Sequence, residues 1–362
     1  MMDMTEDTKK KALIAMSGGV DSSVAAYLTK AMGYDCTGCT MKLFDGEDSE
    51  QVLSKTCCSL SDVEDAGSVC RKLGIPYHVF NFKAEFSEKV INKFIDSYSR
   101  GITPNPCLDC NRYLKFEKLY ERAKVLGCDK IVTGHYAVIE EKDGKYLLKK
   151  GADETKDQSY VLYTLTQEQL AHTLFPLGSI TKKEAREIAE QNGFINFNKA
   201  DSQDICFVPD GDHRKFIESY TGKEYPEGDF IGPDGDVIGK HKGIIAYTIG
   251  QRKGLGVAYG EPLFVKKICP LENRVYLGRD EELFKRDADV YDLHMISGEV
   301  PDGPFRCKVR IRYKHKEKDA TVTPAGDGKA HITFDEPQRA ITPGQAAVFY
   351  DGDIVLGGGI II

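Results

Sequence analysis

A loop of small and polar residues near the start of the chain has the composition of a phosphate-binding turn. The segment Ser17-Gly18-Gly19-Val20-Asp21-Ser22-Ser23 follows an apolar run at 11–16 and precedes a helix-like stretch at 24–30, which predicts strand, turn and helix. Adjacent glycines let backbone N–H groups turn toward an anion, and the serine hydroxyls and the helix N-terminus add donors and positive charge. No lysine follows the glycines, so the loop differs from the one that grips the β and γ phosphates in γ-phosphoryl transfer. The alternative interpretation is an ordinary strand-to-helix turn capped by a serine.

Three cysteines form a second group with chemical potential. Cys107 and Cys110 lie in the proline-stiffened segment 103–111, just before a predicted helix whose N-terminus would favour thiolates. A single C-x-x-C is compatible with a redox pair, half of a zinc site or part of an iron–sulfur site. The best candidate to complete it is Cys206 in the polar run 201–207, near a domain boundary where loops commonly line active sites. Taken alone, Cys206 is equally well interpreted as a small buried side chain.

Other reactive residue types have simpler explanations. Cys36 and Cys39 fall in a predicted strand, where their spacing points the two side chains to opposite faces, so we expect them to pack in the core. His135 follows another predicted strand and, by itself, is compatible with a hydrogen-bonded histidine in a turn.

Alternating β and α patterns through about residue 135 predict how the first group is positioned. Such alternation implies an α/β fold with a doubly wound parallel sheet that binds its ligand at the carboxyl edge of the strands. A hairpin turning at Asp143-Gly144 and two more helices complete this part. The expected strands lie near 13–16, 36–43, 77–81 and 130–133, the helices near 61–73, 84–98, 111–126, 167–174 and 182–192, and the hairpin at 136–150.

Two changes in composition predict domain boundaries. Glycine and proline become dense around Phe207, and from Leu263 short β-rich runs alternate with turns. We therefore expect a first domain at 1–208, a small mixed middle domain at 209–283 and a C-terminal β-barrel at 284–362. A chain of 362 residues is long enough to give two or three domains a core each.

Composition limits the possible environments and partners. The formal net charge of −7 excludes a uniformly basic nucleic-acid binder, so a nucleic-acid surface would have to be local. Eleven cysteines, an odd number, point away from a disulfide framework. The charged N-terminus, the short apolar run after it and the lack of a membrane-length stretch predict a cytoplasmic protein that does not use a membrane.

A basic run near the C-terminus is the candidate local surface. Every even position from 306 to 318 is lysine or arginine, and only Glu317 interrupts the run with an acid. In an extended strand these cations would share one face, at about 6.6 Å intervals, while Cys307, Val309, Ile311 and Tyr313 form the apolar face. This predicts a stripe for RNA phosphates, and a charged edge strand protected against aggregation is the alternative. A second contact is expected at 251–254 in the middle domain.

Motifs spread over nearly the whole chain resemble those of the tRNA-specific 2-thiouridylase family, within the ATP pyrophosphatase superfamily. They occur in the order of that family, at 17–23, 103–111, 134–137, 156–160, 201–207, 247–256 and 344–350. The family adenylates O2 of the wobble uridine, position 34 of certain tRNAs, and then replaces that oxygen with sulfur. The resemblance implies ATP and Mg²⁺ as cofactors, the tRNA anticodon arm as partner, a separate sulfur donor and a monomeric protein.

The resemblance also assigns roles to individual residues, with Asp21 holding Mg²⁺ or the loop itself. The ATP-binding residues would be Ala15, Met16, Ser17, Gly18, Gly19, Val20, Asp21, Ser22, Met41 and Gly134. Asn105, Pro106 and Cys107 would contact the target base, and tRNA would contact His135, Lys156, Asp157, Gln158, Arg312, Tyr313 and Gln345. Cys110 and Cys206 match the nucleophile and the persulfide carrier of the family.

One position departs from the well-known branch of the family, which carries an aspartate proposed as an acid/base where this chain has Cys107. The resulting three-cysteine set resembles a less familiar branch thought to hold a [4Fe–4S] cluster, here through Cys107, Cys110 and Cys206. One iron would then be open to hydrosulfide, supplied as free sulfide or by a desulfurase. A Cys206 persulfide acting with Cys110, and a zinc or purely structural pair, are the alternatives.

Two other functions are compatible with these motifs. An amide- or lysidine-forming ligase of the same superfamily would use ammonia or an amine and would survive the loss of Cys110 and Cys206. A metal-stabilised RNA-binding module would bind tRNA without releasing AMP and pyrophosphate.

Overall fold

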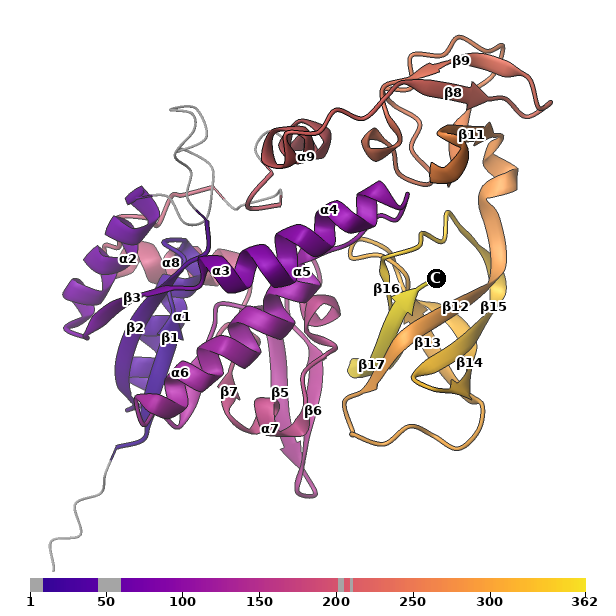
Figure 1. Cartoon of the computed structure of the whole chain (residues 1–362). Helices are drawn as coiled ribbons and strands as arrows, with labels where there is room; N and C mark the ends of the chain where they lie inside the picture. The colour runs from indigo at the N-terminus through magenta and orange to yellow at the C-terminus, as the bar shows by residue number, and fades with distance from the viewer. Residues whose placement is uncertain (1–8, 45–59, 201–204, 209–210) are drawn as a thin grey trace, which may run out of the picture. The chain divides into compact units, whose positions relative to one another are not determined.

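The computed structural model describes residues 9–44, 60–200, 205–208 and 211–362 (Figure 1). The chain divides into two compact units, which are described separately: Met1–Ser87 with Asp109–Phe207, and Glu88–Leu108 with Val208–Ile362. Residues 88–108 thus group with the C-terminal part of the chain. None of the described helices is long and apolar enough to cross a membrane.

A parallel sheet of five strands forms the centre of the first unit, in the order β3-β2-β1-β4-β7. The central strand β1 pairs in parallel with β2 on one side and β4 on the other, so that Ala12 lies opposite both Cys36 and Lys130. This arrangement confirms the predicted doubly wound α/β fold. The strands are β1 (Lys11–Ala15), β2 (Asp35–Lys42), β3 (Tyr77–Asn81), β4 (Lys130–Val132) and β7 (Thr173–Leu174).

Helices lie against this sheet (Figure 1), and their buried side chains form a common core with it. The core joins alanines and valines of α1, α2 and α8 to Ala12 and Ile14 of β1. The helical segments through residue 191 are α1 (Val20–Ala31), α2 (Leu60–Leu73), α3 (Lys83–Phe86), the π-helical turn η1 (Ser87–Ile91), α4 (Asn92–Ser99), α5 (Pro106–Asp109), the π-helical η2 (Cys110–Lys118), α6 (Leu119–Val125), the 3₁₀ turn η3 (Ser159–Leu162), α7 (Gln167–Ala171) and α8 (Lys182–Gln191).

The helix predicted at 167–174 is wrong at its end. α7 begins with a capping box of Thr166 and Gln169 and stops at Ala171, and the next residues form β7, where Thr173 pairs with Ile131 of β4. A strand of two residues is too short to display a period of two. The sequence pattern therefore could not separate it from the helix that precedes it.

The predicted hairpin at 136–150 is confirmed. β5 (Ala137–Lys142) and β6 (Lys145–Lys150) pair antiparallel, with Lys142 opposite Lys145. Asp143 and Gly144 take positive φ angles of 53° and 74°, as a tight two-residue hairpin turn requires.

The two cysteines of β2 are buried, as the sequence predicts. Cys36 is 3 % exposed and Cys39 is fully buried. Burial raises the pKa of the Cys36 thiol to about 11, with a smaller contribution from Asp35. Cys36 therefore stays protonated at neutral pH and acts as a core residue.

The second unit contains a small sheet in the order β10-β11-β8-β9. Its pairs are antiparallel except for β11 and β8, where Val275 lies parallel to Phe230. The elements are α9 (His213–Thr221), β8 (Gly228–Ile231), β9 (Val237–His241), η5 (Ile244–Ala246), β10 (Phe264–Cys269), η6 (Pro270–Glu272), β11 (Arg274–Gly278) and η7 (Asp280–Leu283).

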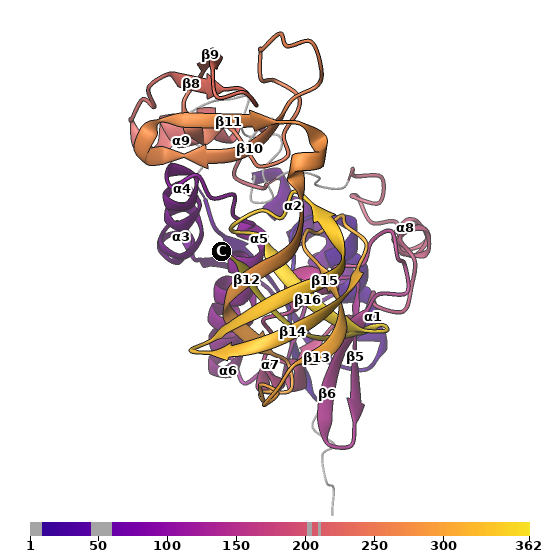
Figure 2. The same ribbon diagram turned by 90° about the vertical axis from the view of Figure 1, so that its right-hand side faces the viewer.

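The predicted C-terminal β-barrel is confirmed (Figure 2). Its strands follow the order β12-β15-β14-β13-β16-β17, and β12 pairs with β17 to close the barrel. Val290, Val309, Ile332 and Phe349 are among the buried side chains that fill it. The strands are β12 (Phe284–Met295), β13 (Phe305–Arg310), β14 (Lys318–Gly326), β15 (Lys329–Arg339), β16 (Ala346–Asp351) and β17 (Ile354–Ile361).

The predicted stripe of seven cations is wrong. β13 does alternate as expected, with Arg306 and Lys308 exposed while Cys307 and Val309 are buried, but the strand ends at Arg310. The chain then turns through 311–317 before β14 begins. Tyr313 is 37 % exposed and does not continue the apolar face.

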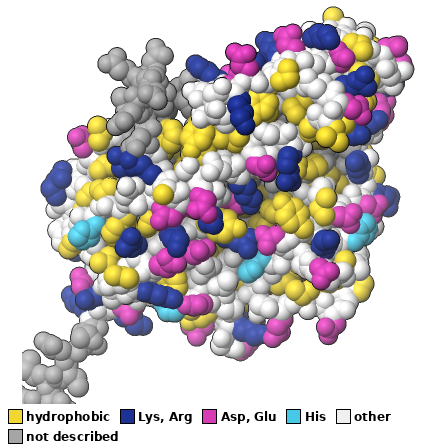
Figure 3. Space-filling view, viewed as in Figure 1, with side chains coloured by type: hydrophobic (Ala, Val, Ile, Leu, Met, Phe, Trp, Pro, Cys, Tyr) yellow, Lys and Arg dark blue, Asp and Glu magenta, His cyan; other side chains and the backbone are white. Residues whose placement is uncertain are grey.

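Acidic residues from other positions of the barrel neutralise much of this run. The salt bridges are Arg306 to Asp335, Lys308 to Asp319, Arg310 to Glu317 and Lys318 to Glu336. Figure 3 likewise shows basic and acidic side chains intermixed over the visible face. The acids come mostly from neighbouring strands, so a linear reading of 306–318 overstates the local positive field.

Candidate active site

The glycine-rich loop lies at the carboxyl end of the central strand. β1 ends at Ala15 and α1 begins at Val20, so residues 16–19 make the turn. The neighbours β2 and β4 lie on opposite sides of β1, which makes this the switch point at which α/β sheets bind ligands. Met41, near the end of β2, and Gly134, just after β4, belong to the same edge.

Two glycines are required by close backbone approach. Gly18 has a φ of +72°, and a Cβ there would come within 2.5 Å of the carbonyl oxygen of Asp62. A Cβ on Gly134 would lie 2.8 Å from the carbonyl carbon of Asp21 and 2.9 Å from the nitrogen of Ser22. Any larger residue at either position would therefore displace the loop or the start of α1.

The serine hydroxyls act inside the loop. Ser22 Oγ and Ser23 Oγ each donate to the carbonyl of Gly19 at 3.0 Å, and the Ser17 N–H donates to Ser22 Oγ at 3.2 Å. Gly19 is the N-cap of α1 and no side chain caps this end, which excludes the serine-capped turn. In the described ranges the N–H groups of Gly18 and Gly19 have no protein acceptor, so this pair of donors is available to an anion.

Asp21 is engaged by two side chains from distant parts of the chain. Lys182 Nζ, at the start of α8, lies 2.8 Å from both carboxylate oxygens, and Tyr136 donates its hydroxyl to Oδ1 at 2.7 Å. The Lys182 side chain is 11 % exposed and that of Asp21 is 33 % exposed, so the lysine end of this ion pair is buried and the carboxylate end is partly open to solvent. Lys182 and Tyr136 together fix the position of the Asp21 carboxylate.

The three candidate cysteines occupy different settings. Cys107 lies in α5 and is exposed, and its N–H donates to the Asn105 side chain, whose Oδ1 lies 3.1 Å away. Cys110 starts η2 and is half-buried, as is Cys206. The buried ring of Phe207, packed edge to face on Phe86 at 5.6 Å, fixes the chain next to Cys206. Residues 201–204 of the same motif lie outside the described ranges.

The fit of a metal site can be tested on the donor groups. Among the described residues, which include all three candidate cysteines, no group of three or more cysteine, histidine, aspartate or glutamate side chains is placed to hold a metal ion.

Asn111, next to Cys110, is buried without full hydrogen bonding. Its Nδ2 donates to the carbonyl of Val161 at 2.9 Å, while its Oδ1 has no partner in the described part of the chain. An orphaned buried acceptor is unusual enough to mark a site where a ligand or water can complete the set.

His135 is buried rather than exposed for direct RNA contact. Thr133 Oγ1 lies 2.6 Å from its Nδ1, and Lys115 Nζ lies 3.4 Å from its Nε2. Burial, with a further contribution from the Lys115 charge, lowers the pKa of His135 well below 6.5. His135 is therefore neutral at physiological pH.

The segment 156–158 bonds to nearby backbone groups, mainly through the side chains of Asp157 and Gln158. Asp157 is buried and accepts hydrogen bonds from the N–H groups of Gly151 and Ser159, at 3.2 and 3.1 Å. Gln158 forms two hydrogen bonds with Tyr136, whose hydroxyl contacts Asp21: its Oε1 accepts from the Tyr136 N–H, and its own N–H donates to the Tyr136 carbonyl. Lys156 is half-exposed.

The C-terminal candidates lie in the second unit. The Arg312 guanidinium donates to the carbonyls of Ile249 and Ala340, at 3.2 and 2.7 Å, and to the Thr342 hydroxyl. Gln345 Nε2 donates to the carbonyl of Thr103 at 2.8 Å, just before the candidate base-contacting residues 105–107. These contacts give both residues a bracing role within the unit.

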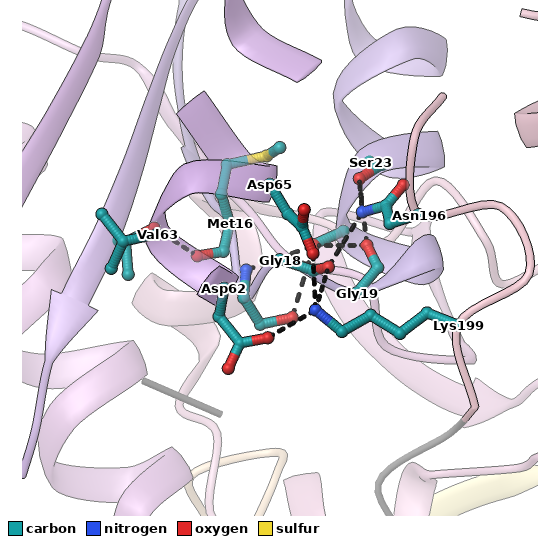
Figure 4. A network of polar contacts seen from close by, with 12 residues as sticks. Met16, Gly18, Gly19, Ser23, Asp62, Val63, Asp65, Asn196 and Lys199 are labelled. Carbon is teal, nitrogen blue, oxygen red and sulfur yellow. Dashed lines mark hydrogen bonds and ion pairs between the residues drawn. The ribbon is translucent and has the colours of Figure 1, made fainter. Parts of the chain in front are cut away.

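Several residues at the loop were not found from the sequence. Lys182 reaches Asp21, and Asn196, Lys199, Asp62 and Asp65 form a polar network against the first glycine of the loop (Figure 4). Lys182 and Asp21 are 161 positions apart. Only the start of α8, visible as Thr-x-x-Glu at 181–184, offered a local signal that a helix begins there.

Similarity to known proteins extends over nearly the whole chain. Three family models match in succession: a "tRNA methyl transferase HUP domain" at 10–210, a "tRNA methyl transferase PRC-barrel domain" at 214–279 and an "Aminomethyltransferase beta-barrel domain" at 286–361. A "tRNA-specific 2-thiouridylase MnmA" of Clostridioides difficile (strain 630) is 52 % identical over 354 residues, 97 % of this chain and 98 % of that protein. Proteins of the same name in Acetivibrio thermocellus, 52 % identical over 98 % of this chain and 99 % of theirs, and Clostridium perfringens, 49 % over 98 % and 99 %, are also similar.

Proposed function

Because this chain belongs to the tRNA-specific 2-thiouridylase family, we propose that it is an ATP-dependent sulfurtransferase that replaces O2 of the wobble uridine, position 34 of tRNA, with sulfur. The observation that carries the proposal is the full-length identity of about one residue in two, together with the anion-binding loop at the switch point of the sheet. The cytoplasm is the compartment in which such an enzyme would meet tRNA, and we propose that it acts as a monomer.

The first step would activate the base. ATP would place its β and γ phosphates against the N–H groups of Gly18 and Gly19, with Mg²⁺ balancing their charge. Uridine O2 would attack the α phosphorus, forming an O2–P bond while the bond from the α phosphorus to the bridging oxygen breaks and pyrophosphate leaves. The adenylated O2 is a good leaving group, so C2 becomes open to a sulfur nucleophile.

The second step would transfer sulfur through Cys110 and Cys206. A sulfur donor would load Cys206 as a persulfide, whose terminal sulfur attacks C2 and displaces AMP with the former O2. Cys110 would then attack the Cys206 sulfur, which releases the 2-thiouridine and leaves a disulfide between the two cysteines. A thiol reductant is needed to restore both thiols for the next turnover.

A [4Fe–4S] cluster on Cys107, Cys110 and Cys206 is the second candidate for sulfur delivery. The presence of a third thiol where a carboxylate is expected favours it. We derive no step through the cluster. Iron and acid-labile sulfide in anaerobically purified protein decide between the two: about four irons per chain, lost with activity in Cys107→Ala, would support the cluster.

Binding of tRNA would combine local contacts from several parts of the chain. We propose a catalytic domain at 1–208, a middle domain at 209–283 and a barrel at 284–362 that holds the anticodon arm. Lys156 and Tyr313 would contact RNA directly, while His135, Asp157, Gln158, Arg312 and Gln345 would support the contact surface. Asn105, Pro106 and Cys107 would line the position of the flipped base.

The test is a thiolation assay on a tRNA transcript, with AMP and pyrophosphate release measured in parallel. Cys110→Ser and Cys206→Ser should each lower the rate of thiolation at least a hundredfold. Asp21→Ala should weaken the binding of ATP. Cys128→Ser is the matched control, because this half-buried thiol of the same unit has no proposed role.

The same assay separates the rival functions. Unchanged thiolation in Cys110→Ser, Cys206→Ser and Asp21→Ala would contradict the assignment. Adenylation that survives loss of both cysteines and yields an amide or amine product would indicate a ligase of the same superfamily. Tight tRNA binding without any AMP or pyrophosphate release would indicate a non-catalytic module.

A further inference from the structure

The carbonyl of Gly18 is held by a turn that follows α8. Asn196 is 3 % exposed, and its Nδ2 lies 2.9 Å from both the Gly18 oxygen and Ser23 Oγ. Lys199 Nζ approaches the same Gly18 oxygen at 3.4 Å (Figure 4). A carbonyl oxygen can only accept, so the amide of Asn196 must present its Nδ2 to Gly18, and the orientation of this side chain is determined.

These contacts fix the orientation of one peptide group. The peptide between Gly18 and Gly19 is planar and trans, so its N–H points away from its C=O. While Asn196 and Lys199 hold the Gly18 oxygen, the Gly19 N–H is turned to the opposite side, where it has no acceptor in the described part of the chain. Glycine pairs permit a peptide flip at low cost, and a flip here would present an oxygen to the phosphate instead of a donor.

The second glycine carbonyl is directed through the same network. Ser23 accepts from Asn196 and donates its hydroxyl to the Gly19 oxygen at 3.0 Å. Asn196 therefore acts on both carbonyls, directly on Gly18 and through Ser23 on Gly19. Both oxygens are kept out of the space toward which the N–H groups point.

Lys199 is itself held by α2. Its Nζ lies 2.6 Å from Asp62 Oδ1 and 2.7 Å from Asp65 Oδ2. Burial alone would lower the pKa of Lys199, but hydrogen bonds and charges of the two carboxylates together raise it. Lys199 thus remains a cation that links α2, the turn at 196–199 and the loop.

We propose that Asn196 and Lys199 are positioning residues that lock the Gly18–Gly19 peptide in the orientation that binds the pyrophosphate of ATP. The lock supplies from a distant part of the chain the rigidity that two adjacent glycines lack. The inference rests on the proposed function only in assuming that the loop receives the ATP phosphates.

The test compares two ligands of the full-length protein by calorimetry: inorganic pyrophosphate, which needs the loop, and AMP, which lacks the β and γ phosphates. Asn196→Ala should lower the affinity for pyrophosphate about tenfold, since the loss of one or two hydrogen bonds is worth roughly this factor. The affinity for AMP should stay within about twofold of that of the unchanged protein. Lys199→Met should act in the same direction with a smaller effect, because its contact with Gly18 is longer.

Two control variants remove comparable hydrogen bonds nearby without touching the loop. Asn192 donates Nδ2 to the Ile188 carbonyl, and Lys72 donates Nζ to the Gly193 carbonyl, both at 2.8 Å. Asn192→Ala and Lys72→Met should bind pyrophosphate and AMP as the unchanged protein does. Thermal unfolding of each variant identifies any that fail to fold. If Asn196→Ala fails to fold, Lys199→Met still tests the proposal, because Lys199 is half-exposed and its replacement disturbs the core less.

A charge effect of Lys199 is separated by a double variant. Lys199→Met leaves Asp62 and Asp65 without their cation, so Asp65→Asn is added to reduce the negative charge. Pyrophosphate binding that stays weak in the double variant supports a lock, and full recovery would show that Lys199 acts through charge alone and would overturn its part in the proposal.

Two outcomes distinguish the lock from the proposed function. If a folded Asn196→Ala variant loses affinity equally for pyrophosphate and AMP, or for neither of them, the proposed lock is wrong whatever the thiolation assay shows. If pyrophosphate weakens selectively while the unchanged protein releases no AMP with tRNA, the lock stands and the proposed function fails.

Discussion

At the scale of single residues, the glycines of the anion-binding loop are defined by what surrounds them. Gly18 combines a positive φ with backbone contact to Asp62, whereas Gly33, at the end of α1, has a φ of +90° with no atom within 4 Å of an added Cβ. An alanine at either position would therefore have a strained backbone, but only at Gly18 would its Cβ also collide with a neighbouring residue. This difference makes them a matched pair for testing the loop.

Gly18→Ala should lower the affinity for ATP more than tenfold, because the added Cβ would lie 2.5 Å from the Asp62 oxygen and force the loop outward. Gly33→Ala should cost about 1 kcal/mol of unfolding free energy, from strain alone, and leave ATP binding unchanged. Calorimetry with ATP and denaturant unfolding of both variants check this. Equal ATP affinity in the two would contradict the close approach at Gly18.

His135 should make the protein lose stability in acid. Its pKa is lowered by burial and by Lys115, so below about pH 6.5 the unfolded state takes up a proton that the folded state does not. The unfolding free energy should then fall with decreasing pH, by up to about 1.4 kcal/mol per pH unit from this group. His135→Gln should remove that part of the slope in urea unfolding series between pH 7.5 and 5.5.

His331 serves as a comparison of opposite sign. Hydrogen bonding to Asp289 raises the pKa of this half-exposed residue, so its contribution is present below about pH 6.5 and is lost as pH rises through the raised value. His331→Gln should accordingly weaken the protein slightly at pH 5.5 and not at pH 8.5. A His135→Gln variant that kept the acid slope would show that other groups cause it.

At the scale of elements, α8 links helix capping to the ATP loop. It begins with a capping box in which Thr181 accepts from the Glu184 N–H and Glu184 accepts from the Thr181 N–H. The first residue after the cap is Lys182, which holds Asp21. Fraying of this end would therefore move the ion pair as well as the helix. α7 has the same capping box at Thr166 without such a neighbour.

Thr181→Ala and Thr166→Ala should each cost about 1 kcal/mol of unfolding free energy, the usual value for a lost N-cap. Only Thr181→Ala should also raise the KM for ATP, by about threefold to tenfold, because Lys182 loses its fixed position. Steady-state AMP release over a range of ATP concentrations measures this, and an equal KM in both variants would argue against the coupling.

At the scale of the whole molecule, charge is distributed so that few long basic stretches remain. The net charge is −7, and the run at 306–318 is paired with acids across the barrel. Exposed ion pairs of this kind contribute little stability but cancel the field that would attract phosphates. We therefore expect tRNA binding to use cations close to the proposed site, among them Lys156.

Lys156→Gln should weaken tRNA binding about threefold to tenfold and lower the slope of log Kd against log salt by about one. Lys308→Gln should leave both nearly unchanged, because Asp319 already occupies that cation at 3.0 Å. Filter binding of a tRNA transcript between 50 and 300 mM salt compares them. A larger loss in Lys308→Gln than in Lys156→Gln would restore the basic run as the main RNA contact.

Features that depend on neighbours along the chain could be predicted from the order of residues. The strand, turn and helix around Ser17–Ser23, the hairpin at Asp143-Gly144 and the burial of Cys36 each follow from periods of two or 3.6 and from glycine placement. Local steric and hydrogen-bond preferences act within a few residues, so they are legible in the order of residues alone.

The distant side chains that complete the site are brought to it by the three-dimensional fold. Lys182 reaches Asp21, Asn196 holds Gly18, and Asp335 neutralises Arg306, across separations of 161, 178 and 29 residues. The sheet order brings these groups together, and no local preference encodes a partner that far away. For the same reason the basic run is continuous in sequence: its neutralising acids become neighbours only when the strands of the barrel pair.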